Sequence, residues 1–199
     1  MKQFRHWHEV VLAGLLVALG LFAQVVDPAF LSIRVQSEIA GSIWELAIVA
    51  IPVTLIVLTG GIDLSVGAMM SLSAVALGLS FEARLPVALC VAISVGAGTF
   101  AGLINGLFVS KAKVHPLIVT LATMSAFYGL AEGLSHARPI SGFPVGLSQL
   151  LGNPGIVVLI IGLVAVLFLA KTVSGQALYA IGLNELATRY SGIKVDRVK

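Results

Sequence analysis

The chain of 199 residues is 58% hydrophobic and only 11% charged, with a mean hydropathy of +1.06. Soluble globular domains carry about 25% charged residues, so this composition excludes an ordinary soluble domain and predicts a protein that crosses a membrane several times. The net charge of +3 could suit a nucleic-acid-binding protein, but the basic residues are scattered between apolar runs and form no basic stripe. We therefore expect the chain to lie in a lipid bilayer and to bind no nucleic acid.

The first apolar run covers residues 10–26 and follows a basic and aromatic start at residues 1–9. This pattern resembles a signal peptide, but the run is longer than a typical apolar core of about 7–15 residues, and no small-x-small cleavage site follows it. It is therefore interpreted as an uncleaved first transmembrane helix. Asp27-Pro28 ends this span, and residues 29–36 are interpreted as a short segment on the membrane surface.

A membrane-spanning helix needs about 20 predominantly apolar residues, and about six stretches meet or nearly meet this length. They are residues 10–26, 39–59, 64–81, 85–109, 116–134 and 154–170. The sequence therefore predicts an all-α fold, a polytopic transmembrane helical bundle, over residues 1–170. A cytoplasmic segment is expected at residues 171–199, where the apolar pattern stops.

Lysine and arginine residues decide the orientation of these spans. If the N-terminus is cytoplasmic, nine of them are inside and three are outside. The nine are Lys2, Arg5, Lys111, Lys113, Lys171, Arg189, Lys194, Arg197 and Lys199, and the three are Arg34, Arg84 and Arg138. Because cytoplasmic loops carry an excess of Lys and Arg, both ends of the chain are predicted to be cytoplasmic.

The second and third spans are joined by a glycine-rich stretch that contains Gly60, Gly61, Asp63, Ser65 and Gly67. Glycines end a helix at low cost, and a carboxylate just before a new helix accepts hydrogen bonds from its free N–H groups. Asp63 is therefore expected to cap the third span or to contact the moving parts beside a transport path. Lipid cannot satisfy freed backbone groups or a charge, so the break must face protein or water.

Two further polar residues lie within apolar runs and join Asp63 as candidates for a substrate path. Asn105 is costly in lipid, so it is expected to form a hydrogen bond with another helix or to face a cavity. Glu45 either lines a water-filled path or extends to the outer interface. These alternatives are left open by the sequence.

Small residues recur every four positions along the fourth span, at Ser94, Gly98, Gly102 and Gly106. Such a ridge lets a neighbouring helix approach closely, so these residues are predicted to pack helices together. The single cysteine, Cys90, is interpreted as a packing residue. The histidines show no metal-ligand spacing, and no cofactor or metal is expected.

The segment after Lys171 contains a predicted short cytoplasmic helix at residues 184–192. Asn184 is a plausible N-cap, Glu185 suits the positive end of the helix dipole, and Gly192 suits the position just after the helix. Leu186 and Tyr190 share one face at i, i+4 spacing. A helix this short is marginal by itself, so it either docks onto a partner or connects to a further span.

Four blocks of this sequence, in their order and spacing, resemble the permease subunit of ribose-type sugar ABC importers, a family that also includes xylose, rhamnose and autoinducer-2 permeases. The blocks are Val57-Leu58-Thr59-Gly60-Gly61-Ile62-Asp63-Leu64-Ser65-Val66-Gly67, Gly102-Leu103-Ile104-Asn105-Gly106-Leu107, Pro116-Leu117-Ile118-Val119-Thr120-Leu121-Ala122-Thr123-Met124, and Gly175 with Leu178-Tyr179-Ala180-Ile181-Gly182 and Asn184. The resemblance runs from about residue 40 to the end. Family members have more spans, so the chain is expected to correspond to their N-terminal part only.

The resemblance implies a permease subunit of an importer for a monosaccharide or similar small polyol, in the bacterial inner membrane. Its implied partners are a second permease subunit, in a homo- or heterodimer, paired cytoplasmic ATP-binding-cassette ATPase subunits, and a periplasmic sugar-binding protein. The predicted helix would then be the coupling helix received by the ATPase, with residues Asn184, Glu185, Leu186, Arg189, Tyr190 and Gly192. No phosphate-binding Gly-x-x-x-x-Gly-Lys-Ser/Thr motif occurs, so energy must come from the partner.

Two alternatives remain open beside the importer. An ion-coupled secondary transporter would use Asp63 and Glu45 to carry protons and would need no ATPase. A non-transporting membrane scaffold would need neither. An intramembrane enzyme is disfavoured, because the sequence has no paired-His zinc spacing, no Gly-x-Ser-x-Gly and no acidic metal cluster.

Overall fold

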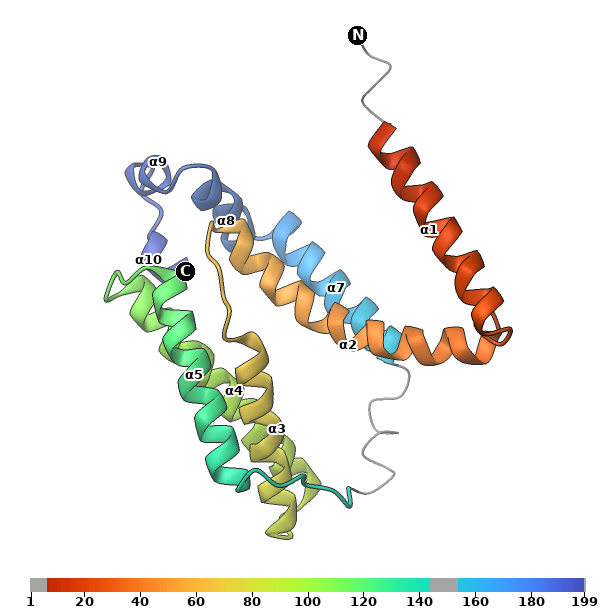
Figure 1. Ribbon diagram of the computed structural model, residues 1–199. Coiled ribbons are helices and arrows are strands. Elements are labelled where there is room, and N and C mark those ends of the chain that lie inside the picture. The colour runs from red at the N-terminus through yellow and green to blue at the C-terminus, as the bar shows by residue number, and fades with distance from the viewer. Residues whose placement is uncertain (1–6, 144–153, 199) are drawn as a thin grey trace. The chain divides into compact units, whose positions relative to one another are not determined.

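The computed structural model describes residues 7–143 and 154–198, and within them every regular element is a helix (Figure 1). The longer helices are α1 (Trp7–Val26), α2 (Ile33–Leu58), α3 (Val66–Glu82), α4 (Val87–Ser110), α5 (Pro116–Ser135) and α7 (Pro154–Lys171), and the shorter ones are α8 (Val173–Leu183), α9 (Glu185–Tyr190) and α10 (Val195–Val198). The predicted all-α class is confirmed. Lys2, Arg5, Lys199 and residues 144–153 of the predicted outer loop lie outside the described residues.

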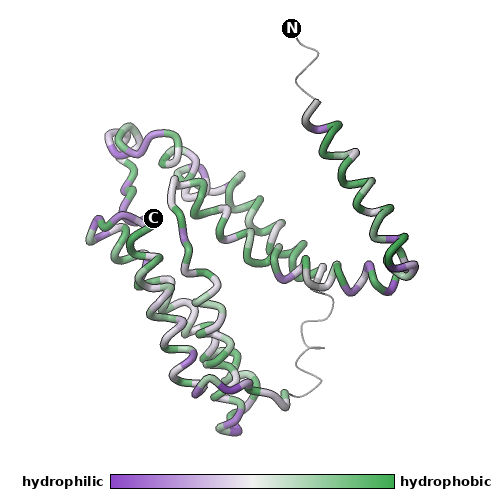
Figure 2. The backbone as a smooth tube through the Cα atoms, viewed as in Figure 1, coloured by the Kyte–Doolittle hydropathy of each residue, from purple (hydrophilic) through white to green (hydrophobic). Residues whose placement is uncertain are grey.

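Helix length and composition agree with a membrane-spanning chain. In the described ranges, four helices are long and apolar enough to cross a membrane, namely α1, α2, α4 and α5, and α7 with α8 makes a fifth if this bent pair is one span. Helix α3 is apolar but shorter. Figure 2 shows hydrophobic helix middles and hydrophilic residues gathered at helix ends and connections. The polytopic helical bundle is thus supported.

The chain divides into two compact units, residues 1–46 and 47–199. In the first unit, α1 ends at Val26 and the turn after it is held by Gln24, whose side chain accepts from the N–H of Leu31 at 2.9 Å and donates to the carbonyl of Pro28 at 2.8 Å. Helix α2 begins at Ile33, ahead of the expected start at residue 39. Most of the expected surface segment therefore belongs to a turn followed by the first turn of α2.

In the second unit, α3, α4 and α5 lie side by side as an antiparallel bundle (Figure 1). Its core is formed by Ala68, Ala101 and Phe127, one from each helix. Partly buried side chains pack around them, namely Met69, Leu72, Ile104 and Met124. Two of the three core residues are alanines, so the helix axes can approach closely. The helices are then held together by many van der Waals contacts and not by large side chains.

One end of this bundle is closed by the segment that follows α5. Arg138 donates two hydrogen bonds to the carboxylate of Glu82, at 2.8 and 2.6 Å. Beyond it, Ile140 packs onto Gly78, and the rings of Phe81 and Phe143 lie 5.2 Å apart. The segment therefore folds back over the end of α3, at the side predicted to be outside.

The opposite, predicted cytoplasmic, side carries a helix that the sequence analysis did not assign. Helix α8 follows α7 after the single residue Thr172, at an angle of 76°. The hydroxyl of Thr172 donates to the carbonyl of Phe168 at 2.7 Å, ending α7, and accepts from the N–H of Gly175 at 2.9 Å, starting α8. One side chain thus caps two helices and fixes the bend.

Candidate functional site

The glycine-rich stretch ends α2 with a specific hydrogen-bonding pattern. The N–H of Gly60 bonds to the carbonyl of Val57 at 2.9 Å, and that of Gly61 bonds to the carbonyl of Ile56 at 3.2 Å. Gly60 has φ +75°, the left-handed conformation that a Schellman helix ending requires. The prediction that glycines stop the second span here is confirmed.

The third span does not resume at once, and Asp63 does not occupy the N-cap position that was expected for it. Residues 61–65 run as a non-helical stretch (Figure 1), and Ser65 is the N-cap of α3. Instead, the Asp63 carboxylate accepts from the N–H of Ser65 at 2.8 Å and from its hydroxyl at 2.6 Å. Asp63 therefore stabilises the residues that lead into α3. Its carboxylate bonds to the N-cap residue Ser65, and so it is not available to the first N–H groups of the helix.

Asn105 is joined to this turn from α4. Its Nδ2 donates to the hydroxyl oxygen of Ser65 at 2.7 Å, and Ser65 is completely buried. The expectation of an interhelical hydrogen bond is confirmed. Asn105 is only 6% exposed, yet its second polar atom, Oδ1, has no hydrogen-bond partner among the described residues.

A cavity of about 690 Å³ lies beside this chain of hydrogen bonds. Gly61, Ile62 and Asp63 line it from the break, and its other walls come from the end of α2 and from α3, α4, α5, α7, α8 and α10. Polar lining groups are few: Thr59, Asp63, Asn105, Thr120, Ser174 and Arg197. A mostly apolar concavity with a few convergent polar groups is typical of a small-molecule site. The structure thus brings Asp63 and Asn105 to one place.

The predicted packing ridge on α4 is divided by this cavity. The Ser94 hydroxyl donates to the carbonyl of Ser73 on α3 at 2.8 Å, and a Cβ at Gly98 would lie 2.9 Å from the Ser73 hydroxyl oxygen. By contrast, a Cβ at Gly102 or Gly106 would meet no described atom within 4 Å, and both glycines line the cavity. The packing interpretation holds for the first half of the ridge and requires correction for the second.

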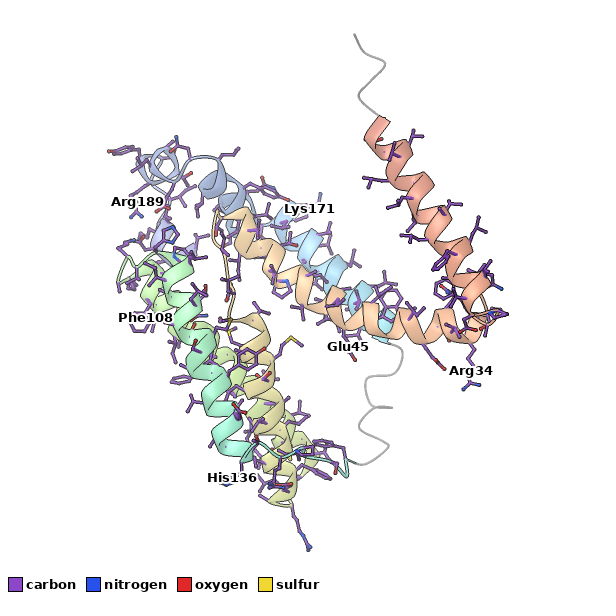
Figure 3. All side chains as sticks on the ribbon, viewed as in Figure 1. Arg34, Glu45, Phe108, His136, Lys171 and Arg189 are labelled. Atoms are coloured by element: carbon purple, nitrogen blue, oxygen red, sulfur yellow. The ribbon has the colours of Figure 1, made fainter. Side chains whose placement is uncertain are left out.

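Glu45 is not among the residues that line this cavity. It lies in the other compact unit, on α2, where its side chain is exposed (Figure 3). Gly67, from the glycine-rich stretch, faces Tyr128 rather than the cavity, since a Cβ there would lie 3.4 Å from the tyrosine oxygen.

The predicted cytoplasmic helix forms as α9. The Asn184 side chain accepts from the N–H of Ala187 at 2.9 Å and so acts as the N-cap, and Gly192 has φ +87° just beyond the helix. Both local predictions are confirmed. Leu186 and Tyr190 are 66% and 89% exposed, so the apolar face of this helix is open in the structure.

Charged side chains tie α9 to the rest of the unit. Arg189 donates to Asp196 at 2.9 Å and to Glu185 at 3.1 Å, and Lys113, in the turn between α4 and α5, also pairs with Asp196. Hydrogen bonds from Arg189 and then from Lys113 hold the pKa of the Asp196 carboxyl well below its ordinary value. Figure 3 shows Arg189 at the end of the bundle opposite His136.

Three residues of this region were not singled out from the sequence. Thr120 approaches the carbonyl of Ile62 at 3.5 Å, His115 caps α5 by accepting from the N–H of Leu117 at 3.3 Å, and Asp196 forms the ionic link. The Pro116 that follows His115 was a usable signal, since proline favours the first helical turn. No sequence signal pairs residues as distant as Lys113 and Asp196.

Comparison with known proteins gives a consistent family. A family model described as the permease component of a branched-chain amino acid transport system matches residues 36–199. Similar proteins include the autoinducer 2 import system permease protein LsrD of Escherichia coli and that of Shigella flexneri, each 33% identical over 208 aligned residues. The alignment covers 98% of this chain and 63% of each relative, so the chain spans less than two thirds of their length. No solved structure matches the chain significantly.

Proposed function

Because this chain belongs to the family of permease components of branched-chain amino acid transport systems, we propose that it forms part of the translocation path of an ATP-binding-cassette importer in the bacterial inner membrane. Its substrate is a monosaccharide or a similar small polyol. The similarity to autoinducer 2 import permeases and the mostly apolar cavity with few polar groups support a small neutral substrate.

The observation that carries this proposal is the composition of the cavity walls. One wall is the break at residues 61–63, and others come from the predicted cytoplasmic part, where Ser174, Leu178, Arg197 and Val198 line the same space. A force applied to α9 therefore acts on elements that border the cavity. Opening and closing a path by rigid shifts of such elements is how transporters alternate access.

The partner that supplies the force is an ATPase subunit that receives α9. The exposed side chains of Leu186 and Tyr190 suit an apolar groove, and helix-in-groove docking uses anchors at this i, i+4 spacing. The pairing of Arg189 with Asp196, and of Asp196 with Lys113, links α9 to the turn between α4 and α5. A second permease subunit and a periplasmic binding protein complete the assembly.

The test is uptake by proteoliposomes that contain the protein assembled with its ATPase, its second permease subunit and its binding protein. Ribose and autoinducer 2 serve as substrates. We expect uptake that requires internal ATP and continues when an uncoupler removes the proton gradient. Uptake that collapses with the uncoupler while ATP is maintained would instead establish the ion-coupled transporter, and absence of uptake for both substrates would overturn the polyol assignment.

The coupling role of α9 has its own test in the same system. Tyr190→Ala removes an 89% exposed side chain, so folding should be unaffected while substrate-stimulated ATP hydrolysis falls at least fivefold. Val173→Ala is the matched control, because Val173 is 86% exposed at the start of α8, outside α9. Equal effects of the two variants would contradict docking through α9.

A further inference from the structure

A second and smaller cavity, of about 380 Å³, lies at the predicted cytoplasmic end of the second compact unit. It is lined by Lys111, Arg189, Gly192, Ile193, Lys194, Val195, Asp196 and Arg197, and we call it the basic pocket. Four of these residues are basic and only one is acidic. The lining therefore carries an excess of positive charge, in contrast to the mostly apolar walls of the larger cavity.

The one acidic residue of the basic pocket already has two cationic partners. Asp196 accepts from Arg189 at 2.9 Å and pairs with Lys113. The three remaining basic side chains of the lining are exposed and form no ion pair or hydrogen bond with any described residue: Lys111, Lys194 and Arg197. Because like charges repel and no other acidic residue belongs to the described lining, this pocket attracts an anion.

The shape of the basic pocket is fixed by the chain itself. Gly192 has φ +87°, so the chain turns back directly after α9. Val195 is completely buried and anchors the returning segment, and Asp196 joins that segment to the turn between α4 and α5 through Lys113. Basic residues from two distant parts of the sequence are thereby held around one pocket.

The position of this pocket beside a membrane-spanning helix favours a lipid as the source of the anion. Lys111 directly follows α4, which is long and apolar enough to cross a membrane. Phospholipid headgroups lie at the ends of such spans, and the cytoplasmic leaflet carries anionic lipids that attract basic residues beside a span. In the last turn of α4, Leu107 and Phe108 are 48% and 50% exposed, which suits contact with acyl chains. A free phosphate ion has no acyl chain to use this surface.

We propose that the basic pocket binds the phosphate headgroup of an anionic phospholipid. The guanidinium of Arg197 suits two parallel hydrogen bonds to phosphate oxygens, and the ammonium groups of Lys111 and Lys194 act as point charges. Because Arg189 of α9 also lines the pocket, the bound lipid connects the membrane surface with the proposed coupling helix. This inference goes beyond the proposed function and does not depend on which substrate is transported.

The first experiment titrates phosphatidylglycerol onto the purified protein in a neutral detergent and counts bound lipid by native mass spectrometry. Phosphatidylcholine, which has no net charge, is the comparison lipid. We expect phosphatidylglycerol to bind about tenfold more tightly, because several basic residues face one anionic headgroup. Equal affinity for the two lipids would overturn the proposal.

Single variants locate the site. Lys111→Gln and Lys194→Gln should each raise the Kd for phosphatidylglycerol about fivefold, the contribution of one basic residue near an anionic lipid. Lys171→Gln is the matched control, because it removes the same charge from the last turn of α7, outside the pocket, and its Kd should stay within about twofold of the unmodified protein. All three side chains are exposed, so the thermal midpoints without lipid should be equal. Equal effects of the three variants on the Kd would overturn the site.

The second experiment distinguishes a lipid from a soluble anion. Inorganic phosphate replaces chloride at constant ionic strength during the same titration. We expect the affinity for phosphatidylglycerol to be unchanged, since the free ion cannot contact the exposed last turn of α4. Displacement of the lipid by inorganic phosphate would assign the pocket to a soluble anion and overturn the lipid assignment.

The third experiment repeats the lysine comparison in the assembled importer, where the ATPase is the competing occupant. We expect Lys194→Gln to weaken phosphatidylglycerol binding there as well, with Lys171→Gln again unaffected. Loss of this difference on assembly would show that the ATPase covers the pocket and would overturn the proposal. Substrate uptake tests the importer separately, so failure of lipid binding with normal uptake leaves the proposed function standing.

Discussion

The two halves of the small-residue ridge on α4 have the same sequence character and opposite surroundings. Ser94 and Gly98 lie against Ser73 of α3, where a hydrogen bond and a close contact leave no space. Gly102 and Gly106 continue the ridge but border the cavity. Small residues in a membrane helix therefore allow close packing where another helix lies against them. Where the neighbouring helix has not yet begun, as α3 begins only at Val66, the same small residues leave open space.

The largest expected effect comes from filling the open half. A Cβ at Gly106 would meet no described atom within 4 Å, and the residue lines the cavity, so Gly106→Leu should leave assembly and thermal stability normal. Because the new side chain occupies the cavity, substrate uptake should fall at least tenfold. Uptake assays with size-exclusion chromatography of the same sample check both parts, and normal uptake would show that substrate does not pass this cavity.

The next effect concerns the turn that delays α3. Asp63→Leu removes two hydrogen bonds from Ser65 to a carboxylate, each of a kind that contributes about 1.5–3 kcal/mol, so the yield of assembled complex should fall severely. Asp63→Asn keeps an acceptor oxygen and should retain most assembly and most uptake. Severe uptake loss with intact assembly in both variants would indicate that the charge itself is required.

A smaller effect is expected from overfilling the packed half. A Cβ at Gly98 would lie 2.9 Å from the Ser73 hydroxyl oxygen, so Gly98→Leu must displace the Ser73 side chain, and overpacking typically costs about 1–3 kcal/mol. Thermal unfolding of the purified complex should show a lower midpoint, while the KM for uptake is unchanged in the protein that remains folded. A midpoint equal to that of Gly106→Leu would remove the distinction between the two halves.

The smallest effect should follow from removing the exposed ion pairs that Asp196 forms with Arg189 and Lys113. The pKa of Asp196 is lowered by Arg189 and Lys113, so its stabilisation is present above the ordinary aspartate value of 3.8 and is lost as pH falls below it. Asp196→Asn should remove this contribution at neutral pH. Thermal unfolding of the purified complex checks this: the difference in midpoint between the unmodified protein and Asp196→Asn should be the same from pH 8 to pH 5, and its loss within that range would contradict the lowered pKa of Asp196.

Local chemistry in the sequence was sufficient for the helices and for several caps. Runs of apolar residues predict the spans because their length must match the bilayer. Gly60, Asn184 and Gly192 were predicted correctly because helix ends depend on neighbouring residues only. The alternation of apolar runs with basic turns likewise needs no tertiary contact to be interpreted.

The site depended on contacts that no local pattern encodes. Asp63 was expected at the N-cap, but Ser65 stands there, and its hydroxyl bonds to the Asp63 carboxylate and to Asn105 of α4. Whether a glycine packs or opens a cavity depends on which helix faces it, and Asp196 meets Lys113 across 83 positions of sequence. The sequence by itself thus determined which segments are helical and where they stop, since those properties arise from adjacent residues. Only the tertiary structure decided which polar groups share a cavity, because that depends on how the helices pack.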